Sequence, residues 1–232
     1  MKRALSRGVN SLRSLLAAFA LGVASCAPAA AAEETFNAPA AQRTASEGSG
    51  LKTAYFAGGC FWGVEAVFSH MKGVKSAVSG YHGGNADTAT YSQVSTGTTQ
   101  HAEAVKVVYD PSVVRYDQLL RVFFSVVADP TLRNRQGPDT GPQYRAALIP
   151  VSAEQRAVAA AYLAQMKSSG VWSRPVVTEI ESPKRFYEAE EYHQDFAKKN
   201  PGHPYIRRWD APKVAAFREM FPSLYSAAFQ AG

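Results

Sequence analysis

Cys60 is the residue whose type and position most directly indicate chemistry. It follows Gly58-Gly59, where an apolar strand pattern over 51–57 changes to a helical pattern that begins at Phe61. A sulfur at a helix N-terminus faces unpaired backbone N–H groups and the positive end of the helix dipole, which lowers the pKa of a thiol from ~8.5. The glycines permit the sharp turn. This context favours a nucleophilic thiol over a buried structural cysteine.

Glu103 is the second candidate, in a strand pattern over 101–109. The alternation puts Glu103 on the same face as Val105 and Val107, so its carboxyl is expected to point into an apolar layer. Burial raises the pKa of a carboxyl from ~4.3, and a carboxyl that is neutral near pH 7 can donate a proton. The alternative is a strand-end glutamate that reaches solvent.

The chain around these residues resembles the A-type peptide methionine sulfoxide reductases over residues 51–222. The resemblance lies in Gly59-Cys60-Phe61-Trp62-Gly63-Val64-Glu65, Thr90-Tyr91, residues 101–105, Tyr109-Asp110-Pro111, Asp129-Pro130, residues 135–145, His193-Gln194 and Pro204-Tyr205-Ile206. It implies an enzyme that reduces the S epimer of methionine sulfoxide, free and in proteins, at the expense of thiols. In this scheme Cys60 attacks the sulfoxide sulfur and becomes a sulfenic acid, and Glu103 protonates the sulfoxide oxygen.

The same resemblance implies the substrate-binding residues. Phe61 and Trp62 would hold the substrate methyl group, Tyr91 and Tyr144 would bind the sulfoxide oxygen, and Asp139 would contact the substrate backbone. His193 matches a family histidine, although a helix histidine that orients Asp139 or only packs fits the pattern equally well. No metal is expected, because the five histidines show no ligand spacing, and no cofactor is implied.

The cysteine count indicates how Cys60 would be regenerated. No cysteine follows Cys60, and Cys26 is the only other one. An external thiol, either a thioredoxin-like protein or a small thiol, must therefore reduce the sulfenic acid. The other expected partners are oxidised proteins and free methionine sulfoxide, and the expected state is a monomer.

The N-terminus is typical of an export signal. Lys2, Arg3, Arg7 and Arg13 precede the ten-residue apolar run 15–24, which is too short for a permanent membrane span. Val23-Ala24-Ser25-Cys26 resembles a lipoprotein box that would put a lipid on Cys26, whereas Ala30-Ala31-Ala32 offers cleavage after residue 32. Either outcome places the protein in a bacterial periplasm or on a membrane through that lipid.

Without those four basic residues the net charge falls from +6 to +2, which argues against nucleic-acid binding.

The remaining pattern predicts a signal segment over 1–25, an Ala/Pro-rich tether over 26–50 and a catalytic domain over 51–225. Strand patterns are expected at 51–57, 74–81, 101–109, 144–149 and 175–181, and helical patterns at 61–71, 119–127, 152–167 and 184–199. Their alternation predicts an α+β fold, a two-layer α/β sandwich around a mixed sheet, with a ferredoxin-like core and extensions. The pattern does not show the sheet order.

Two other functions fit parts of the pattern. A cysteine hydrolase would use His193 or His101 as the base for Cys60 and would consume no thiol. A binding module would capture oxidised methionine between Phe61 and Trp62 without turnover. Neither accounts for the thiol, the acid and the tyrosine pair together.

Overall fold

A computed structural model describes Met1 and residues 35–232. Its elements in chain order are β1 (Lys52–Gly58), α1 (Phe61–Ser69), β2 (Val74–His82), η1 (Ala86–Thr88), α2 (Tyr91–Val94), β3 (Ala102–Tyr109), α3 (Tyr116–Val122), η2 (Phe123–Val127), β4 (Arg135–Gln136), β5 (Asp139–Thr140), η3 (Pro142–Tyr144), β6 (Ala146–Ile149), α4 (Ala153–Ser168), β7 (Glu179–Ile180), β8 (Phe186–Glu188), η4 (Glu191–His193), α5 (Phe196–Lys199), η5 (Ile206–Asp210) and α6 (Ala211–Met220). None of the helices described is long and apolar enough to cross a bilayer.

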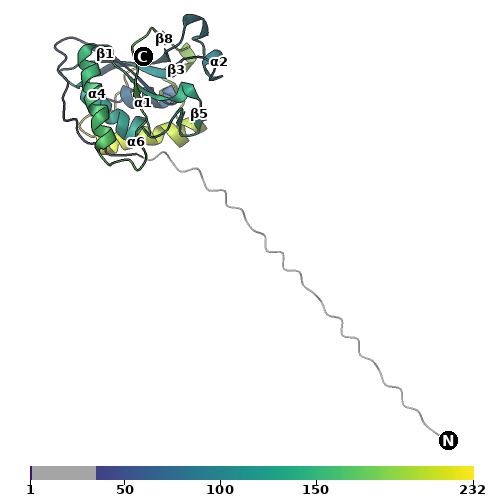
Figure 1. The fold of residues 1–232 in the computed structure, drawn as a ribbon. Helices are drawn as coiled ribbons and strands as arrows, with labels where there is room; N and C mark the ends of the chain where they lie inside the picture. The colour runs from purple at the N-terminus through teal and green to yellow at the C-terminus, as the bar shows by residue number, and fades with distance from the viewer. Residues whose placement is uncertain (2–34) are drawn as a thin grey trace. The chain divides into compact units, whose positions relative to one another are not determined.

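Within residues 35–232, six strands form one mixed sheet in the order β7-β6-β1-β3-β2-β8. Figure 1 shows β1, β3 and β8 of this sheet together with the helices. The four central strands, β6, β1, β3 and β2, are antiparallel to one another. In the chain, α1 lies between β1 and β2, and α3 lies between β3 and β6. This βαββαβ unit is a ferredoxin-like core. Strand β8 extends it beside β2, and β7 pairs in parallel with β6. The predicted α+β sandwich is confirmed.

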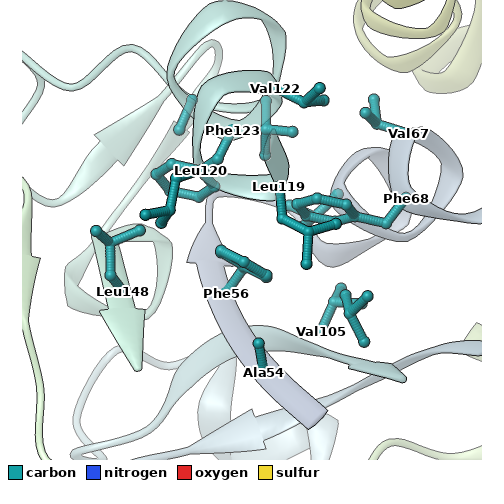
Figure 2. Close-up of a cluster of buried hydrophobic side chains, with 14 of the residues drawn as sticks. Ala54, Phe56, Val67, Phe68, Val105, Leu119, Leu120, Val122, Phe123 and Leu148 are labelled. Carbon is teal, nitrogen blue, oxygen red and sulfur yellow. The ribbon is translucent and has the colours of Figure 1, made fainter. Parts of the chain in front are cut away.

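The core lies between one face of the sheet and the helices. Figure 2 shows Phe56 of β1 among Leu119, Leu120 and Phe123, which come from α3 and the turn after it. The Phe56 ring centroid lies 4.7 Å from that of Phe68 in α1 and 5.7 Å from that of Phe123. All five side chains are buried, so the apolar layer behind the central strands is continuous.

Residues 184–199 differ from prediction. They form β8, η4 and α5 instead of one helix. Phe186 pairs with His82 on the edge of β2, and its ring stacks on Tyr55 at a centroid distance of 5.1 Å. Asp195 has a φ of 55°, which ends any helical run before α5. Pairing with an open sheet edge therefore overrides the local helical pattern.

The second half of the predicted tether is packed onto the domain. Ala38 and Ala45 are buried, and the Phe36 ring lies 5.6 Å from that of Trp172. Hydrogen bonds join the segment to β3, α3 and α4 through Tyr109, Asp117, Arg121, Tyr162 and Gln165. Residues 36–47 thus cover part of the core, whereas the predicted signal segment, Cys26 and the first half of the tether lie outside the described residues.

Candidate active site

Strand ends bring the predicted site residues to one end of the sheet. Because β1 and β3 are antiparallel with Phe56 opposite Val105, the end of β1 that leads to Cys60 lies beside Glu103. Gly58 pairs with Ala146, which brings in the segment that ends at Tyr144. The end of β2 pairs with the start of β3, and the chain leaves it toward Tyr91.

The turn before Cys60 requires glycine. Gly59 has a φ of 91°, and a Cβ there would lie 2.5 Å from the Cβ of Gln136. A Cβ on Gly58 would lie 2.9 Å from the Phe123 ring. The chain can therefore turn directly from β1 into α1, with Cys60 as the N-cap residue of that helix.

The Cys60 thiol is half-buried, and its pKa is raised, contrary to the prediction from its helix position. Burial is the main cause, and the carboxyls of Glu103 and Asp210 add to it, while the nearby N–H of Trp62 acts in the opposite direction. Desolvation and neighbouring acids thus outweigh the helix dipole, and the thiol is neutral in the ligand-free site.

The side chain of Glu103, from β3, is bonded to the first turn of α1. Its Oε2 accepts the N–H of Phe61 at 2.9 Å, and the side chain is buried. Burial raises the pKa of Glu103 to about 8, against the effect of that hydrogen bond, and Asp139 and Asp210 raise it further. The burial and the raised pKa agree with the neutral carboxyl that the strand pattern predicts. Because Oε2 accepts an N–H, the proton of the neutral acid is on Oε1, where it can be donated.

Trp62 forms a fixed aromatic wall beside the thiol. Its indole stacks on Phe196 at a centroid distance of 3.8 Å and an angle of 10°, and the Tyr205 ring meets it edge-on at 5.8 Å. Its Nε1–H donates to Nδ1 of His193 at 3.1 Å. These contacts hold one orientation of the half-buried indole.

Phe61 is more deeply placed than Trp62. It is buried, and its ring lies 5.9 Å from that of Tyr81 and 5.0 Å from that of His193. Phe61 therefore belongs to the core and at the same time supports the histidine that holds Trp62.

The two predicted phenols flank the same site. Tyr91 begins α2, and its ring lies 4.5 Å from that of His193. Tyr144 ends η3. Burial raises the pKa of both phenols, and the nearby Glu103 raises both further. Both hydroxyls consequently remain protonated and can donate hydrogen bonds.

Asp139 and His193 have different partners from those considered in the sequence. Asp139, in β5, accepts a hydrogen bond from the Tyr205 hydroxyl. His193 lies in a 3-10 turn and accepts from Trp62. The contact seen for His193 thus orients the tryptophan, and Tyr205 is the residue seen to orient Asp139.

Comparison with known proteins identifies the family. The family model described as peptide methionine sulfoxide reductase matches residues 52–224. The chain belongs to the peptide methionine sulfoxide reductase family. It is 53% identical over 177 residues to peptide methionine sulfoxide reductase MsrA 2 of Mesorhizobium japonicum, covering 76% of this chain and 91% of that one. The corresponding Synechocystis protein is 49% identical over 172 residues, covering 74% and 80%.

Solved structures of methionine sulfoxide reductases share the fold. Reduced Mxr1 from Saccharomyces cerevisiae is 32% identical with a TM-score of 0.59, covering 70% of this chain and 93% of that one. Methionine sulfoxide reductase A of Corynebacterium diphtheriae is 36% identical with a TM-score of 0.55, covering 66% and 76%. The protein is thus an oxidoreductase that acts on methionine sulfoxide.

The sequence alone assigns no role to two residues of this reductase site, Tyr205 and Glu190. Tyr205 contacts both Trp62 and Asp139, and its only sequence signal is its position in a matching stretch. Glu190 accepts the Tyr91 N–H at 2.9 Å and the Tyr81 hydroxyl at 2.8 Å. No local pattern marks Glu190, because its partners come from distant parts of the chain.

His193 and His101, the two possible bases of the hydrolase alternative, each accept a structural hydrogen bond at Nδ1. Nδ1 of His193 accepts from Trp62, and Nδ1 of His101 accepts the Gly84 N–H at 3.2 Å. Nε2 of His101 then donates to the carbonyl of Asn85 at 2.9 Å. Neither histidine offers Cys60 a free basic nitrogen, which argues against the hydrolase alternative. Among the described residues no group of three His, Cys, Asp or Glu side chains is placed to hold a metal ion.

Proposed function

We propose that the protein reduces the S epimer of methionine sulfoxide, free and in proteins, through a sulfenic acid on Cys60. One observation carries this proposal: the N–H of Phe61, next to Cys60 in the chain, holds the neutral carboxyl of Glu103. A neutral acid and a neutral thiol therefore lie side by side at one helix start. Oxygen transfer from a sulfoxide needs both of these groups.

The reaction transfers one oxygen atom. Glu103 gives its Oε1 proton to the sulfoxide oxygen while the Cys60 sulfur attacks the substrate sulfur, and the thiol proton passes to the Glu103 carboxylate. Tyr91 and Tyr144 donate hydrogen bonds to the same oxygen and stabilise its developing charge. The bond between the two sulfurs and the sulfur–oxygen bond of the substrate then break as the hydroxyl moves to the Cys60 sulfur. Methionine leaves, and Cys60 carries the hydroxyl as a sulfenic acid.

Epimer selection follows from three fixed directions at the substrate sulfur. Trp62 holds the methyl group, Glu103 and the phenols hold the oxygen, and Cys60 fixes the direction of attack. The remaining substituent is the rest of the methionine, which must point out of the site because free and protein-bound substrates both react. Only one configuration at sulfur meets all of these conditions, and Asp139 fixes the backbone of that substrate.

Regeneration depends on a second molecule. The domain over 51–232 holds no cysteine besides Cys60. One external thiol displaces water from the sulfenic acid to form a mixed disulfide, and a second thiol releases Cys60 and leaves as a disulfide. Cys60 is half-buried, and this step requires that the external thiol reaches its sulfur. The reductant is a thioredoxin-like protein or a small thiol.

The proposal includes a place of action. The basic start, the ten-residue apolar run and the Val-Ala-Ser-Cys sequence support export, with a lipid on Cys26 favoured over cleavage after Ala32. The substrates are then oxidised proteins outside the cytoplasm. The intact mass of protein from a membrane fraction tests this, because a lipidated chain beginning at Cys26 and a free chain beginning at Glu33 differ in mass. An unprocessed chain in the cytosol would contradict export.

The activity is tested with the two epimers separately. Each sulfoxide is incubated with the protein and dithiothreitol, and methionine is quantified. We expect methionine from the S epimer only. Equal reduction of both epimers would contradict the proposed epimer selection at the substrate sulfur. Hydrolysis of an ester substrate without consumption of thiol would support the cysteine hydrolase instead.

A further inference from the structure

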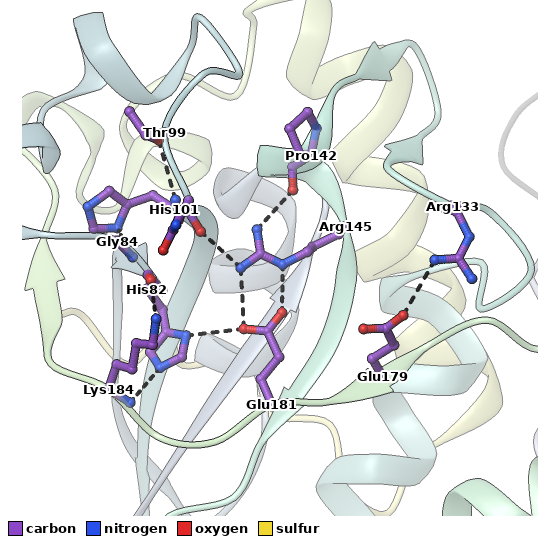
Figure 3. Close-up of polar contacts among 12 residues, drawn as sticks. His82, Gly84, Thr99, His101, Arg133, Pro142, Arg145, Glu179, Glu181 and Lys184 are labelled. Atoms are coloured by element: carbon purple, nitrogen blue, oxygen red, sulfur yellow. Dashed lines mark hydrogen bonds and ion pairs between the residues drawn. The ribbon is translucent and has the colours of Figure 1, made fainter.

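Arg145 joins three segments at the site end of the sheet, as Figure 3 shows. Its Nε donates to Glu181 Oε1 at 2.6 Å, and Nη2 donates to Glu181 Oε2 at 3.2 Å. Nη2 also donates to the carbonyl of Gln100 at 3.2 Å, and Nη1 donates to the carbonyl of Pro142 at 3.0 Å. One planar guanidinium therefore fixes η3, the residue pair before β3, and the chain after β7.

Each of the first two segments carries a group of the proposed mechanism. Pro142 begins the 3-10 turn that ends at Tyr144, and Arg145 follows that tyrosine directly. Gln100 lies three residues before Glu103. Arg145 is thus bonded on one side to the turn that carries the phenol and on the other to the chain that leads to the acid.

Glu181 is itself held in place. Its backbone N–H donates to the carbonyl of Leu148 at 2.9 Å. Nε2 of His82 accepts the Lys184 N–H at 2.9 Å, so the ring proton is on Nδ1, which lies 3.6 Å from Glu181 Oε2. Burial opposes the charged form of Glu181, yet the contacts with His82 and Arg145 lower the pKa of Glu181 to about 2. The carboxylate is therefore charged at every pH at which the enzyme would be assayed.

The geometry points to Arg145 and Glu181 as positioning residues for the reductase: together they hold the Tyr144 phenol in register with the strand that carries Glu103. This inference rests on the proposed function. Neither side chain touches the substrate, and each acts through Tyr144. A lysine at 145 keeps the charge but cannot bind Glu181 and both carbonyls at once, because an ammonium lacks the planar fork.

The test measures kcat and KM for S-methionine sulfoxide in Arg145→Lys and Glu181→Gln, each with and without Tyr144→Phe. We expect kcat/KM to fall on the order of tenfold in either single variant. With Tyr144→Phe already present, the same substitutions should have less than about a twofold effect, since the hydroxyl that they position is absent. A purely structural ion pair would reduce activity equally in both backgrounds.

The matched control is the neighbouring pair Arg133 and Glu179, which is also drawn in Figure 3. Its atoms lie 3.4 Å apart, and both side chains are about two-thirds exposed, at 66% and 63%. Arg133→Lys should leave kcat/KM unchanged. If Arg145→Lys does not fold, Glu181→Gln gives the same comparison with the arginine intact.

The outcomes separate the two proposals. Wild-type protein that reduces neither epimer would overturn the proposed function and this inference with it. Active wild type with unchanged Arg145→Lys and Glu181→Gln variants would overturn the positioning role alone. A loss that is equally large in the Tyr144→Phe background would do the same.

Discussion

At the scale of single residues, the site is defined by where its protons lie. Glu103 has its pKa raised to about 8, and the pKa of Cys60 is also raised, so both groups are protonated at neutral pH. The Phe61 N–H at the helix N-terminus donates to Glu103 and opposes the rise of the Glu103 pKa, but burial outweighs it, and the helix start does not create a thiolate. In the mechanism that we propose, the oxygen transfer therefore depends on the proton of Glu103.

Glu103→Gln keeps the shape of the side chain and removes that proton. We expect the rate of methionine release to fall by ~10²–10⁴-fold, the usual contribution of a general acid. The measurement is a single-turnover experiment with S-methionine sulfoxide and no added reductant. A variant that matches the wild-type rate would remove Glu103 from the mechanism.

The same single-turnover rate should decrease at high pH. The reactive form is the protonated carboxyl, so the rate should be constant below about pH 8 and should decline as the pH rises through the pKa of Glu103, about 8. Omitting dithiothreitol keeps its own ionisation out of the profile. The decline should be absent in Glu103→Gln, and a wild-type rate that increases above pH 8 would contradict the proposed proton transfer.

At the scale of elements, α1 and the segment from β8 to α5 together form the aromatic wall beside the thiol. Trp62 comes from the helix, whereas His193 and Phe196 come from the segment that local pattern predicts to be helical. Glu65 of α1 joins the two elements, because its Oε2 accepts the Asp195 N–H at 3.0 Å. The aromatic wall therefore depends on the pairing of β8 with the edge of β2, which places the segment that carries His193 and Phe196.

His193→Ala leaves the indole N–H of Trp62 without its acceptor. Leaving such a group unpaired costs ~1–3 kcal/mol, so we expect a lower free energy of unfolding and a higher KM. His193→Asn is the control, since its Oδ1 takes roughly the position of Nδ1 and can accept the same hydrogen bond. Urea unfolding and steady-state kinetics on both variants check this, and equal KM values in the two would exclude the wall as the cause.

The ionisation of Glu65 should make the free energy of unfolding depend on pH. Burial is the main cause that raises the pKa of Glu65 to about 8 from 4.5, so between these values the folded protein holds a proton that the unfolded chain has lost. The stability from this group is complete below pH 4.5 and is lost as the pH rises to about 8. In Glu65→Gln, the free energy of unfolding should therefore decline less steeply as the pH rises. The difference in slope from the wild type should be up to ~1.4 kcal/mol per pH unit. Urea unfolding between pH 5 and 8 measures the slope, and an unchanged slope would contradict it.

At the scale of the whole molecule, the domain includes residues that sequence composition assigns to a tether. The Tyr109 hydroxyl donates to Glu47, and the Ala45 N–H donates to Asp117 at 2.8 Å. A chain that starts at residue 51 should therefore unfold at a lower temperature than one that starts at residue 35. Calorimetry on the two truncations decides this, with reductase activity as the check that both are folded.

The thiol count sets the stoichiometry of the whole enzyme. In the domain over 35–232, Cys60 has no partner cysteine in the sequence. Without reductant, each chain should release one methionine and stop, with its mass increased by one oxygen. Cys60→Ser should release none. Two methionines per chain, or a mass lower by two hydrogens, would show that another thiol resolves the intermediate.

The sequence by itself predicted most of the residues that the structure brings together at the site, and most of the elements that carry them. Gly59-Cys60 must lie at a sharp turn because only glycine adopts that φ, and alternation along β3 is enough to bury Glu103. Tertiary structure alone decided the sheet order, the strand at 186–188, the docking of residues 36–47 and the contacts of Tyr205 and Arg145. It also decided the ionisation of Cys60. Each of these depends on contacts between residues far apart in the chain, and desolvation by such contacts outweighs the local field of a helix end.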